Sequence, residues 1–457
     1  MKRILPILLF ALSFIPSSAL GQITQTVEIA SSPNPVGSGA RAIGMGGAFI
    51  GVADDATAAS WNPGGLIQLE TPEISIVGAT SHRKEDTTYQ AFPEASGPQS
   101  VSTTEINYFS GAYPFSAWGR NMIVSLNYQH LYDFNKEVQF AYGFVDPVAP
   151  QLVLNNQVNY EQDGAWKALS PAFAVQVTPT LSVGATVNFW NLGLAENQWE
   201  SVYRSEGSGT LGSAPSVPFD VQTRIDERYR MEGTRIDPAD PLRWHNVNYH
   251  LGLMWNIDSR WTLGAVFKGP FQARLKHDYH FSSLVQFPAP TAPQQNRIDF
   301  TEAVRLDMPM SYGVGVGMRV SDALTFDLDL YRTEWGDFVL YDATGNQSNP
   351  ITGKPADESS SDPTTQVRFG AEYLWIGEKF VVPLRAGVFY DPEPAEGNPD
   401  DFYGFSLGSG IVWGNIVYDA AYQFRFGSDV RSTTVGNADS RQNVQQHTLY
   451  MSVIYHF

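Results

Sequence analysis

The chain has 457 residues and no cysteine, and it carries 47 acidic against 29 basic side chains, which gives a formal net charge of −18. The absence of cysteine excludes disulfides and thiolate–metal sites, and the acidic balance argues against nucleic acid as a partner. Aromatic residues make up 13% of the chain, a profile that suits an outer-membrane barrel with aromatic girdles or a sugar-binding β-protein.

The N-terminus has the pattern of an export signal. Lys2 and Arg3 precede an apolar run from Ile4 to Ile15, and small residues follow at 17–21. This pattern predicts a secretory signal peptide over residues 1–21, cleaved before Gln22. No later run reaches the roughly 18 apolar residues that a membrane helix needs. A helical membrane protein is therefore excluded, whereas a secreted or outer-membrane β-protein is not.

The segment 22–70 differs in character from everything that follows it. Its central part, 39–64, is too rich in Gly and Ala to be a strand and too irregular in its apolar spacing to be a good amphipathic helix. Small residues allow a backbone to approach a wall closely. We therefore predict a hatch, or plug, over 22–70 inside a barrel formed by 71–457. The candidate hatch residues are Arg41, Asp54, Asp55, Asn62, Pro63 and Gly64.

From residue 71 onward, the alternation of apolar and polar residues predicts strands. The connections between them alternate between long and short, which is typical of an outer-membrane barrel with tight periplasmic turns and long external loops. We predict an all-β fold, a 14-stranded antiparallel transmembrane β-barrel with the N-terminal hatch in its lumen. The predicted strands are 71–80, 104–113, 120–134, 165–177, 180–193, 244–256, 260–276, 298–320, 323–335, 365–376, 380–390, 402–413, 415–426 and 444–457.

The two faces of the late strands differ in polarity. In 415–426, Tyr418 and Tyr422 alternate with Asp419 and Arg425, so we expect lipid outside and a polar lumen inside. The chain ends on Phe457 after an alternating strand. A terminal Phe resembles the signal read by the barrel-assembly machinery of the bacterial outer membrane, and the alternative is that the chain ends on Phe by chance.

Several segments together resemble one protein family. The hatch segment, with Gly39, Arg41, Ala42, Gly47, Ala48, Ala53–Ala56 and Asn62-Pro63-Gly64, resembles that of the outer-membrane FadL/TodX family of hydrophobic-compound transporters. The segments 308–312, 334–335 and 385–394 resemble its later barrel hairpins. The family usually has Asn-Pro-Ala at the hatch tip, so Gly64 is a departure that loosens the backbone.

The resemblance implies a function and a route. It implies passive transport of hydrophobic compounds, above all long-chain fatty acids, which bind among external loops, enter an apolar pocket and leave sideways through the wall. The family's side exit is associated with a kink in the third strand, but 121–135 has neither Gly nor Pro, and a bulge could serve instead. Two alternatives remain, an aromatic-hydrocarbon channel of the same fold and a secretion or surface-attachment barrel that binds protein.

Other motifs carry little chemistry. Gly44–Gly47 lacks the last glycine of a dinucleotide-binding turn, and the eight histidines show no metal-binding spacing. Ser125, Asn127 and His130 lack the context of a catalytic nucleophile. Asp54-Asp55 suits a pairing with hatch backbone or arginines better than a cation site. We therefore expect no enzyme, no metal and no cofactor.

The candidate ligand-binding residues follow from strand parity and loop placement. Parity places Lys268, Arg274 and Arg385 inside the barrel, where a cation needs an anionic partner. That partner is a carboxylate of the protein (Asp54, Asp55, Asp327 or Asp329) or the carboxylate of an acyl ligand. The apolar lining predicted from the loops is Phe134, Phe140, Phe144, Phe281 and Phe287. We expect a monomer in the bacterial outer membrane, surrounded by lipid and lipopolysaccharide.

Overall fold

The computed structural model describes residues 37–90, 93–146, 152–193, 196–212, 215–237, 240–431 and 440–457. The predicted signal peptide, and the part of the predicted hatch before Gly37, lie outside these residues. Within the described ranges, no helix combines the length and the apolar character needed to cross a membrane.

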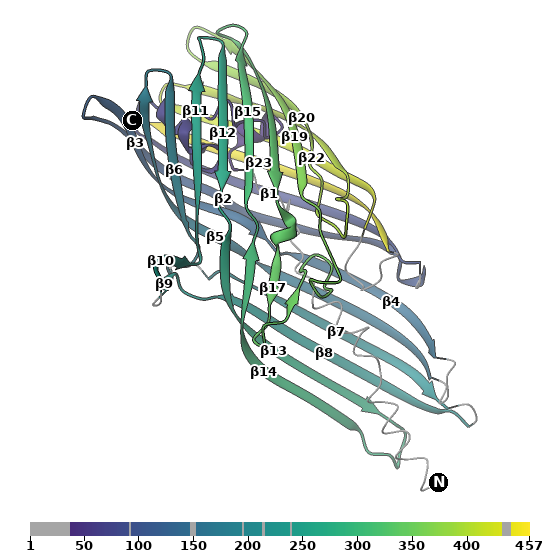
Figure 1. Cartoon of the computed structure of the whole chain (residues 1–457). Helices are drawn as coiled ribbons and strands as arrows, with labels where there is room; N and C mark the ends of the chain where they lie inside the picture. The colour runs from purple at the N-terminus through teal and green to yellow at the C-terminus, as the bar shows by residue number, and fades with distance from the viewer. Residues whose placement is uncertain are drawn as a thin grey trace.

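Fourteen antiparallel strands close into a barrel, as the sequence predicts (Figure 1). The first strand pairs with the last, and Phe457 N–H donates to the Pro72 carbonyl at 3.0 Å. Around the ring the strands are β1 (Glu73–Thr88), β2 (Gly97–Ala117), β3 (Arg120–Asp133), β5 (Leu152–Thr178), β6 (Leu181–Phe189), β11 (Val247–Asn256), β12 (Trp261–Lys268), β15 (Ser311–Arg319), β16 (Leu324–Thr333), β19 (Thr364–Ile376), β20 (Val381–Tyr390), β21 (Phe402–Trp413), β22 (Ile416–Arg431) and β23 (Arg441–His456).

Side-chain alternation explains why this wall suits a bilayer. On β22, Tyr418 and Tyr422 are exposed on the outer surface, whereas Asp419 and Arg425 are buried inside the barrel. Charged side chains facing lipid cost about 2–4 kcal/mol each near the midplane, so this face assignment is strongly favoured. The short turns gather at one end of the barrel, where the chain also ends (Figure 1).

The N-terminal segment lies inside the barrel near the end with the short turns (Figure 1). It contains α3 (Ala40–Gly44), α4 (Ala58–Trp61) and the 3-10 helix η1 (Pro63–Gln68). The helix α3 packs against β21 and β22, and η1 packs against β5, β6 and β11. Nearly every residue from Ser38 to Leu66 is buried.

Glycines of the wall make room for this segment. A Cβ atom at Gly264 of β12 would collide with the Ile50 carbonyl, and one at Gly370 of β19 would collide with the Met45 carbonyl. The glycine-rich face of β15 meets the same segment, since Gly315 lies against Gly51. Small residues on both sides therefore let two backbones touch.

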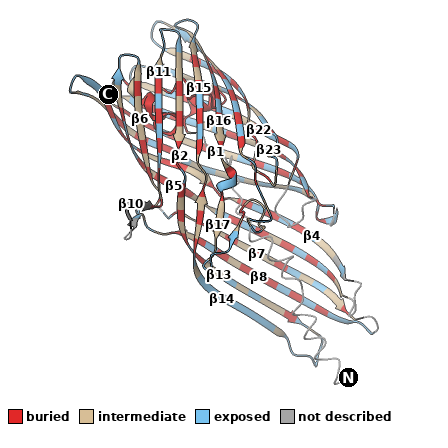
Figure 2. Cartoon of the chain, in the orientation of Figure 1, coloured by how far each residue is buried: buried red, intermediate tan, exposed pale blue. Residues whose placement is uncertain are grey.

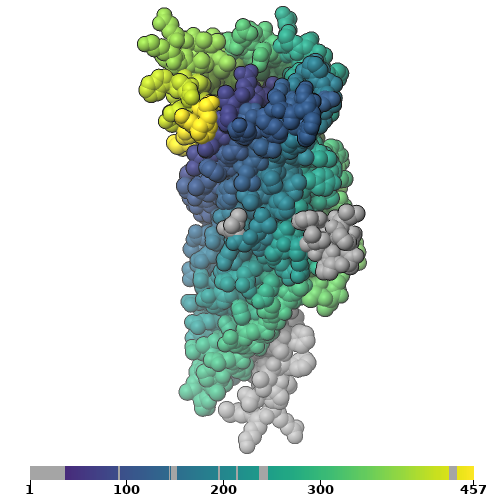
Figure 3. Space-filling model, turned by 90° about the vertical axis from the view of Figure 1, so that its left-hand side faces the viewer, coloured from purple at the N-terminus to yellow at the C-terminus, as the bar shows by residue number. Residues whose placement is uncertain are grey.

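The same sheet continues beyond the barrel at the other end. The strands there are β4 (Lys136–Asp146), β7 (Gln198–Leu211), β8 (Val217–Met231), β13 (Phe271–Gln286) and β14 (Gln294–Met308). They pair in the order β4, β5, β7, β8, β13, β14, in which β5 also belongs to the barrel. We call these five strands and the N-terminal half of β5 the extension. Figure 3 shows the resulting elongated molecule, whose teal and green strands form its narrow end.

Buried and more exposed residues alternate along the strands of the extension as well (Figure 2), but the polarity of the two faces is reversed. On β8, Ile225 and Tyr229 are buried on the inner face, whereas Arg224 and Arg228 point outward with about half of each side chain exposed. Outward charges are unfavourable in lipid but favourable in water. The extension therefore projects beyond the bilayer.

The extension corrects the sequence prediction in two respects. The long connections near residues 150, 220 and 285 are largely strands rather than loops. The predicted strands 260–276 and 298–320 are each two strands, separated at Gly269-Pro270 and at Pro309-Met310. Proline interrupts both because it lacks the N–H that a ladder needs.

The remaining elements are short. They are η2 (Pro93–Ala95), η3 (Trp335–Asp337), the small two-stranded sheet of β9 (Arg235–Asp237) and β10 (Asp240–His245), β17 (Val339–Tyr341) and β18 (Gln347–Ser348). The strand β17 pairs with β14 and thereby joins the edge of the extension to the barrel loops.

Candidate functional site

Buried and partly buried ion pairs join the N-terminal segment 37–70, which we call the hatch segment after the sequence prediction, to the barrel wall. Arg41 of α3 pairs with Asp54 of the same segment and, at 3.0 Å, with Glu372 of β19. Glu372 also accepts a hydrogen bond from Arg385 Nε of β20 at 2.6 Å, and Arg385 Nη1 lies 2.6 Å from Asp419 Oδ1. Arg385 thus points into the barrel, where protein carboxylates neutralise its charge. It is poorly placed to receive a ligand carboxylate.

The inward-facing carboxylates of β16, Asp327 and Asp329, accept hydrogen bonds from backbone N–H groups of the hatch segment rather than pairing with Lys268 or Arg385. Asp329 accepts hydrogen bonds from the N–H groups of Phe49 at 2.6 Å and Ile50 at 2.9 Å, and Asp327 accepts one from Gly51 at 3.3 Å. Each of these hydrogen bonds satisfies a backbone N–H that would otherwise be buried without a partner. These carboxylates therefore fix the hatch segment against the wall.

Asp55 acts within the hatch segment itself. Its carboxylate accepts hydrogen bonds from the backbone N–H and the hydroxyl of Thr57 at 2.8 and 2.6 Å. This is the turn-forming role that short acidic side chains favour. The pair Asp54-Asp55 thus has protein partners on both carboxylates.

The Asn62-Pro63-Gly64 turn fastens the segment to β11. Asn62 is fully buried, and its amide donates to the carbonyls of Ile50 and Leu253, each at 3.0 Å. Pro63 begins η1, where a missing N–H costs nothing. A Cβ atom at Gly64 would lie 3.0 Å from the backbone of Gly252, so the close approach to the wall explains the glycine at this position.

Lys268 lies in a small cavity at the inner end of the extension, lined by both aromatic and polar side chains. Its side chain is buried, and Nζ lies 5.6 Å from the centroid of the Tyr331 ring. The cavity, of about 40 Å³, is also lined by Trp190, Phe271 and Trp335. A cation among rings suits an anionic head group followed by an apolar chain.

The free space beside Lys268 is small, at about 40 Å³. A chain of several methylenes can enter only if the aromatic side chains around Lys268 move.

The predicted phenylalanines occupy three apolar clusters rather than one pocket. Phe134 stacks on Trp199 with ring centroids 4.9 Å apart, in the cluster nearest the barrel. Phe140 and Phe281 belong to the next cluster, and Phe287 packs against the outermost one. Phe144 lies on β4, but its side chain is outside the described part of the structure. The three clusters follow one another along the inner face of β5, β7, β8 and β13, with buried polar residues such as Thr223 and Glu227 between them. We call this row of clusters the apolar track.

The placement of Arg274 inside the barrel was wrong. On β13, Phe271, Ala273 and Leu275 are buried, and Arg274 and Lys276 lie on the opposite, outer face. The parity argument treated 260–276 as one strand, but the break at Gly269-Pro270 shifts the alternation by one residue.

Sequence reasoning did not connect Trp190, Tyr331 and Trp335 with Lys268, which they surround, or Glu372 and Asp419 with Arg385, which they neutralise. Tyr331, Glu372 and Asp419 are inward by strand parity, so the alternation contains that signal. Which of them meet depends on register, as in the direct pairing of Glu372 with Arg385.

Comparison with known proteins agrees with this architecture. The family model described as "Outer membrane protein transport protein (OMPP1/FadL/TodX)" matches residues 35–456. A Pseudomonas aeruginosa FadL homologue of known structure is 15% identical, with a TM-score of 0.55, and the match covers 92% of this chain and 98% of the homologue.

Two toluene transporters of known structure are similar as well. The Pseudomonas putida transporter TodX is 13% identical with a TM-score of 0.53, covering 92% of this chain and 98% of TodX. The Ralstonia pickettii transporter TbuX is 14% identical with a TM-score of 0.51, covering 93% and 99%. At these identities the structures establish the shared fold alone. No curated protein matches the chain.

Proposed function

The chain belongs to the OMPP1/FadL/TodX family of outer-membrane transport proteins for hydrophobic compounds, and on this premise we propose that its cargo is a long-chain fatty acid. It is a transport protein of the bacterial outer membrane, not an enzyme. The observation that carries the proposal is the buried cation Lys268 at the inner end of the apolar track.

The energetics favour an amphiphile. Burying an acyl chain contributes about 0.8 kcal/mol per CH₂, and a hydrogen bond to a charged head group adds about 1.5–3 kcal/mol. The apolar clusters of the extension offer successive sites for the chain, and Lys268 offers a single end point for the carboxylate.

Release is proposed to occur sideways through the wall beside Pro171 of β5. The ladder between β5 and β6 skips Ser170 and Pro171, because proline has no N–H to donate. On the inner side of this gap lie Ala172 and Ala59 of the hatch segment, both buried and small. On the outer side, Pro171 lines a depression of about 340 Å³.

The bulge in β3 is less suitable as an exit. The pairing of β3 with β5 shifts between His130 and Tyr132, so the strand does contain the irregularity that could replace a kink. However, His130 and Asp133 line a polar cavity at this point, together with Glu105. An acyl chain leaving there would cross charged groups, whereas Ser170, Ala172 and Thr186 at the gap beside Pro171 are uncharged.

Uptake of labelled oleate tests the cargo. The gene would be expressed in an acyl-uptake-deficient host, and we expect uptake above the empty vector. Lys268→Met should lower uptake at limiting oleate by about 10- to 100-fold, the loss of one charged hydrogen bond. Lys276→Met, on the outer face of β13, is the matched control and should leave uptake unchanged. No gain over the empty vector would refute the fatty-acid proposal.

A cross-link tests the exit. Cysteines at Ala172 and Thr186, which are paired across β5 and β6, should block uptake when oxidised and restore it on reduction. The pair Ala371 and Ala386, on β19 and β20, is the control and should transport in both states. Transport through the oxidised Ala172–Thr186 pair would place the exit elsewhere.

An aromatic hydrocarbon is the second candidate cargo. The rings of Trp190 and Phe271 stack with centroids 4.9 Å apart and planes 9° apart, a surface that suits a flat ring. Uptake of toluene without uptake of oleate would favour this cargo. The monomeric state and insertion by the barrel-assembly machinery stay predictions.

A further inference from the structure

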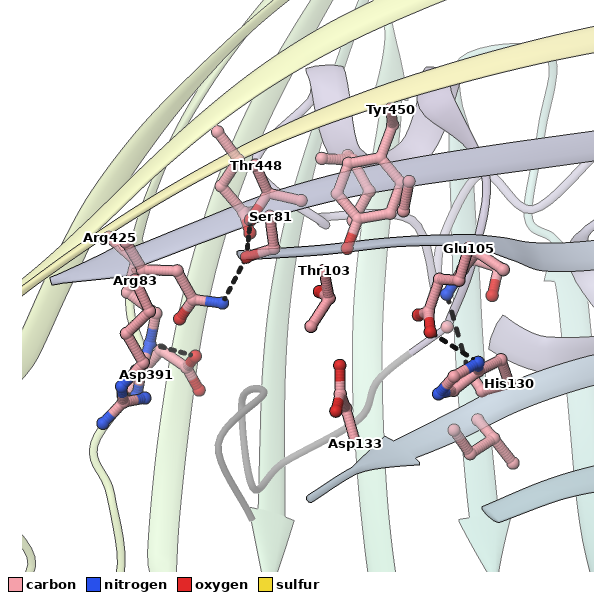
Figure 4. A pocket seen from close by; sticks show the side chains of 18 of the residues that line it. Ser81, Arg83, Thr103, Glu105, His130, Asp133, Asp391, Arg425, Thr448 and Tyr450 are labelled. Carbon is pink, nitrogen blue, oxygen red and sulfur yellow. Dashed lines mark hydrogen bonds and ion pairs between the residues drawn. The ribbon is translucent and has the colours of Figure 1, made fainter. Parts of the chain in front are cut away.

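A cluster of potential metal ligands lies inside the barrel, away from Lys268. Glu105 of β2 and His130 and Asp133 of β3 each offer one ligand atom, and these atoms all lie within 4.8 Å of one another. His130 and Asp133 are both more than nine-tenths buried. The three residues line a cavity of about 130 Å³ beside the hatch segment (Figure 4).

The β3 bulge brings these ligands to one face. His130 and Asp133 are three residues apart, so regular alternation would put them on opposite sides of the wall. The shift in pairing between His130 and Tyr132 turns both inward. Bulges are known to re-aim side chains in this way. Sequence spacing alone could not reveal the cluster.

His130 has unused capacity to bind. Its Nδ1 lies 2.7 Å from Glu105 Oε2, but neither ring nitrogen makes a well-aligned hydrogen bond within the described residues. A buried imidazole nitrogen without a hydrogen bond is costly, and the ring faces the cavity (Figure 4). A cation bound between the imidazole and the carboxylates would satisfy it.

The other charges of the cavity have partners of their own. Arg83 lies 2.7 Å from Glu85, and Arg425 lies 2.9 Å from Asp391, which also lies 3.5 Å from Arg368. These guanidinium groups are therefore neutralised on the opposite side of the cavity. On the side of His130 the cavity is lined by the carboxylates of Glu105 and Asp133, and Asp133 Oδ1 also accepts a hydrogen bond from the Asn135 N–H at 3.0 Å.

We propose that Glu105, His130 and Asp133 bind a divalent transition-metal cation of the zinc type. One imidazole and two carboxylates suit such an ion, whereas Ca²⁺ and Mg²⁺ prefer oxygen ligands alone. The cavity of about 130 Å³ has room for a few waters at about 30 Å³ each, which would complete the coordination.

The site lies at a fork between two strands. The ladder between β2 and β3 ends at Tyr108 and Gln129. Beyond it, β2 stays paired with β1, with Glu105 opposite Ala79, while β3 stays paired with β5. A metal ion bound there holds the two strands together where their hydrogen bonds stop.

Zinc titration of the untagged protein in detergent tests the proposal, with isothermal calorimetry as the readout. We expect one Zn²⁺ per chain, retained in an excess of Ca²⁺. His130→Gln and the isosteric Glu105→Gln should each weaken binding by more than about 100-fold, since losing even an outer partner of a metal ligand costs about 10–100-fold. His82→Gln, an exposed histidine of β1, is the control and should bind as the unaltered chain does.

Folding of each variant would be checked by heat-modified mobility on a gel. Absence of Zn²⁺ binding by the unaltered chain would overturn the proposal, as would undiminished binding by both folded variants. Displacement of Zn²⁺ by equimolar Ca²⁺ would also overturn it, because the site would then be an oxygen site.

Discussion

Replacing Glu372 by glutamine should loosen the hatch segment. Glu372 is the carboxylate that Arg41 of α3 and Arg385 of β20 share, and its side chain is only 6% exposed. Breaking a buried ion pair costs about 3–5 kcal/mol. Arg41 keeps Asp54, and Arg385 keeps Asp419, so we expect the lower end of that range. About 3 kcal/mol corresponds to roughly 100-fold more frequent opening, at about 1.4 kcal/mol per tenfold change.

Thiol labelling measures this opening. The chain has no cysteine, so a single Ser60→Cys substitution in α4, where Ser60 is buried, gives a probe without background. A water-soluble maleimide should react about 100-fold faster when Glu372→Gln is added. The control is Glu378→Gln, at an exposed position in the β19–β20 turn. An unchanged labelling rate, or an equal rise with Glu378→Gln, would refute the anchoring role.

Three further predictions concern other contacts. Gly264→Val should displace the hatch segment, because its side chain would collide with the Ile50 carbonyl, and a larger single-channel conductance in planar bilayers would report it. Asn62→Ala removes the side-chain hydrogen bonds to the carbonyls of Ile50 and Leu253, a loss of about 1–3 kcal/mol that faster hydrogen exchange of residues 50–65 would reveal. In the extension, burial lowers the pKa of His277, but its hydrogen bonds with Glu227 and Glu302 outweigh this effect and raise the pKa above 6.5. The stabilisation that protonated His277 contributes is present below pH 6.5 and is lost as the pH rises through the raised pKa. Hydrogen exchange of β8, corrected for intrinsic rates, should therefore accelerate at alkaline pH. In His277→Gln the exchange of β8 should lose this pH dependence.

The barrel could be predicted because its signal is local. A period of two with one apolar face identifies a strand and its orientation without knowledge of its neighbours, and this sufficed for Asp419, Arg425 and Lys268. The alternation of long and short connections predicted which strand ends lie at the short-turn end of the barrel and which lie at the opposite end. The contacts of Arg41 could not be predicted, because Glu372 is 331 residues away along the chain.

The extension was missed because its polarity is reversed. Arg224 and Arg228 on its outer face make β8 resemble a polar loop, whereas the buried alternation of Ile225 and Tyr229 is that of a strand whose outer side faces water. The misplacement of Arg274 has a related cause, since a single proline break changes the face of every later residue.

The most direct test of the central claim is a crystal structure of the purified barrel with a terminally brominated fatty acid. The account predicts the carboxylate within hydrogen-bond reach of Lys268 Nζ and the bromine among the aromatic side chains that line the inner face of the extension. A carboxylate bound away from Lys268, or a lumen that stays empty at saturating ligand, would contradict it.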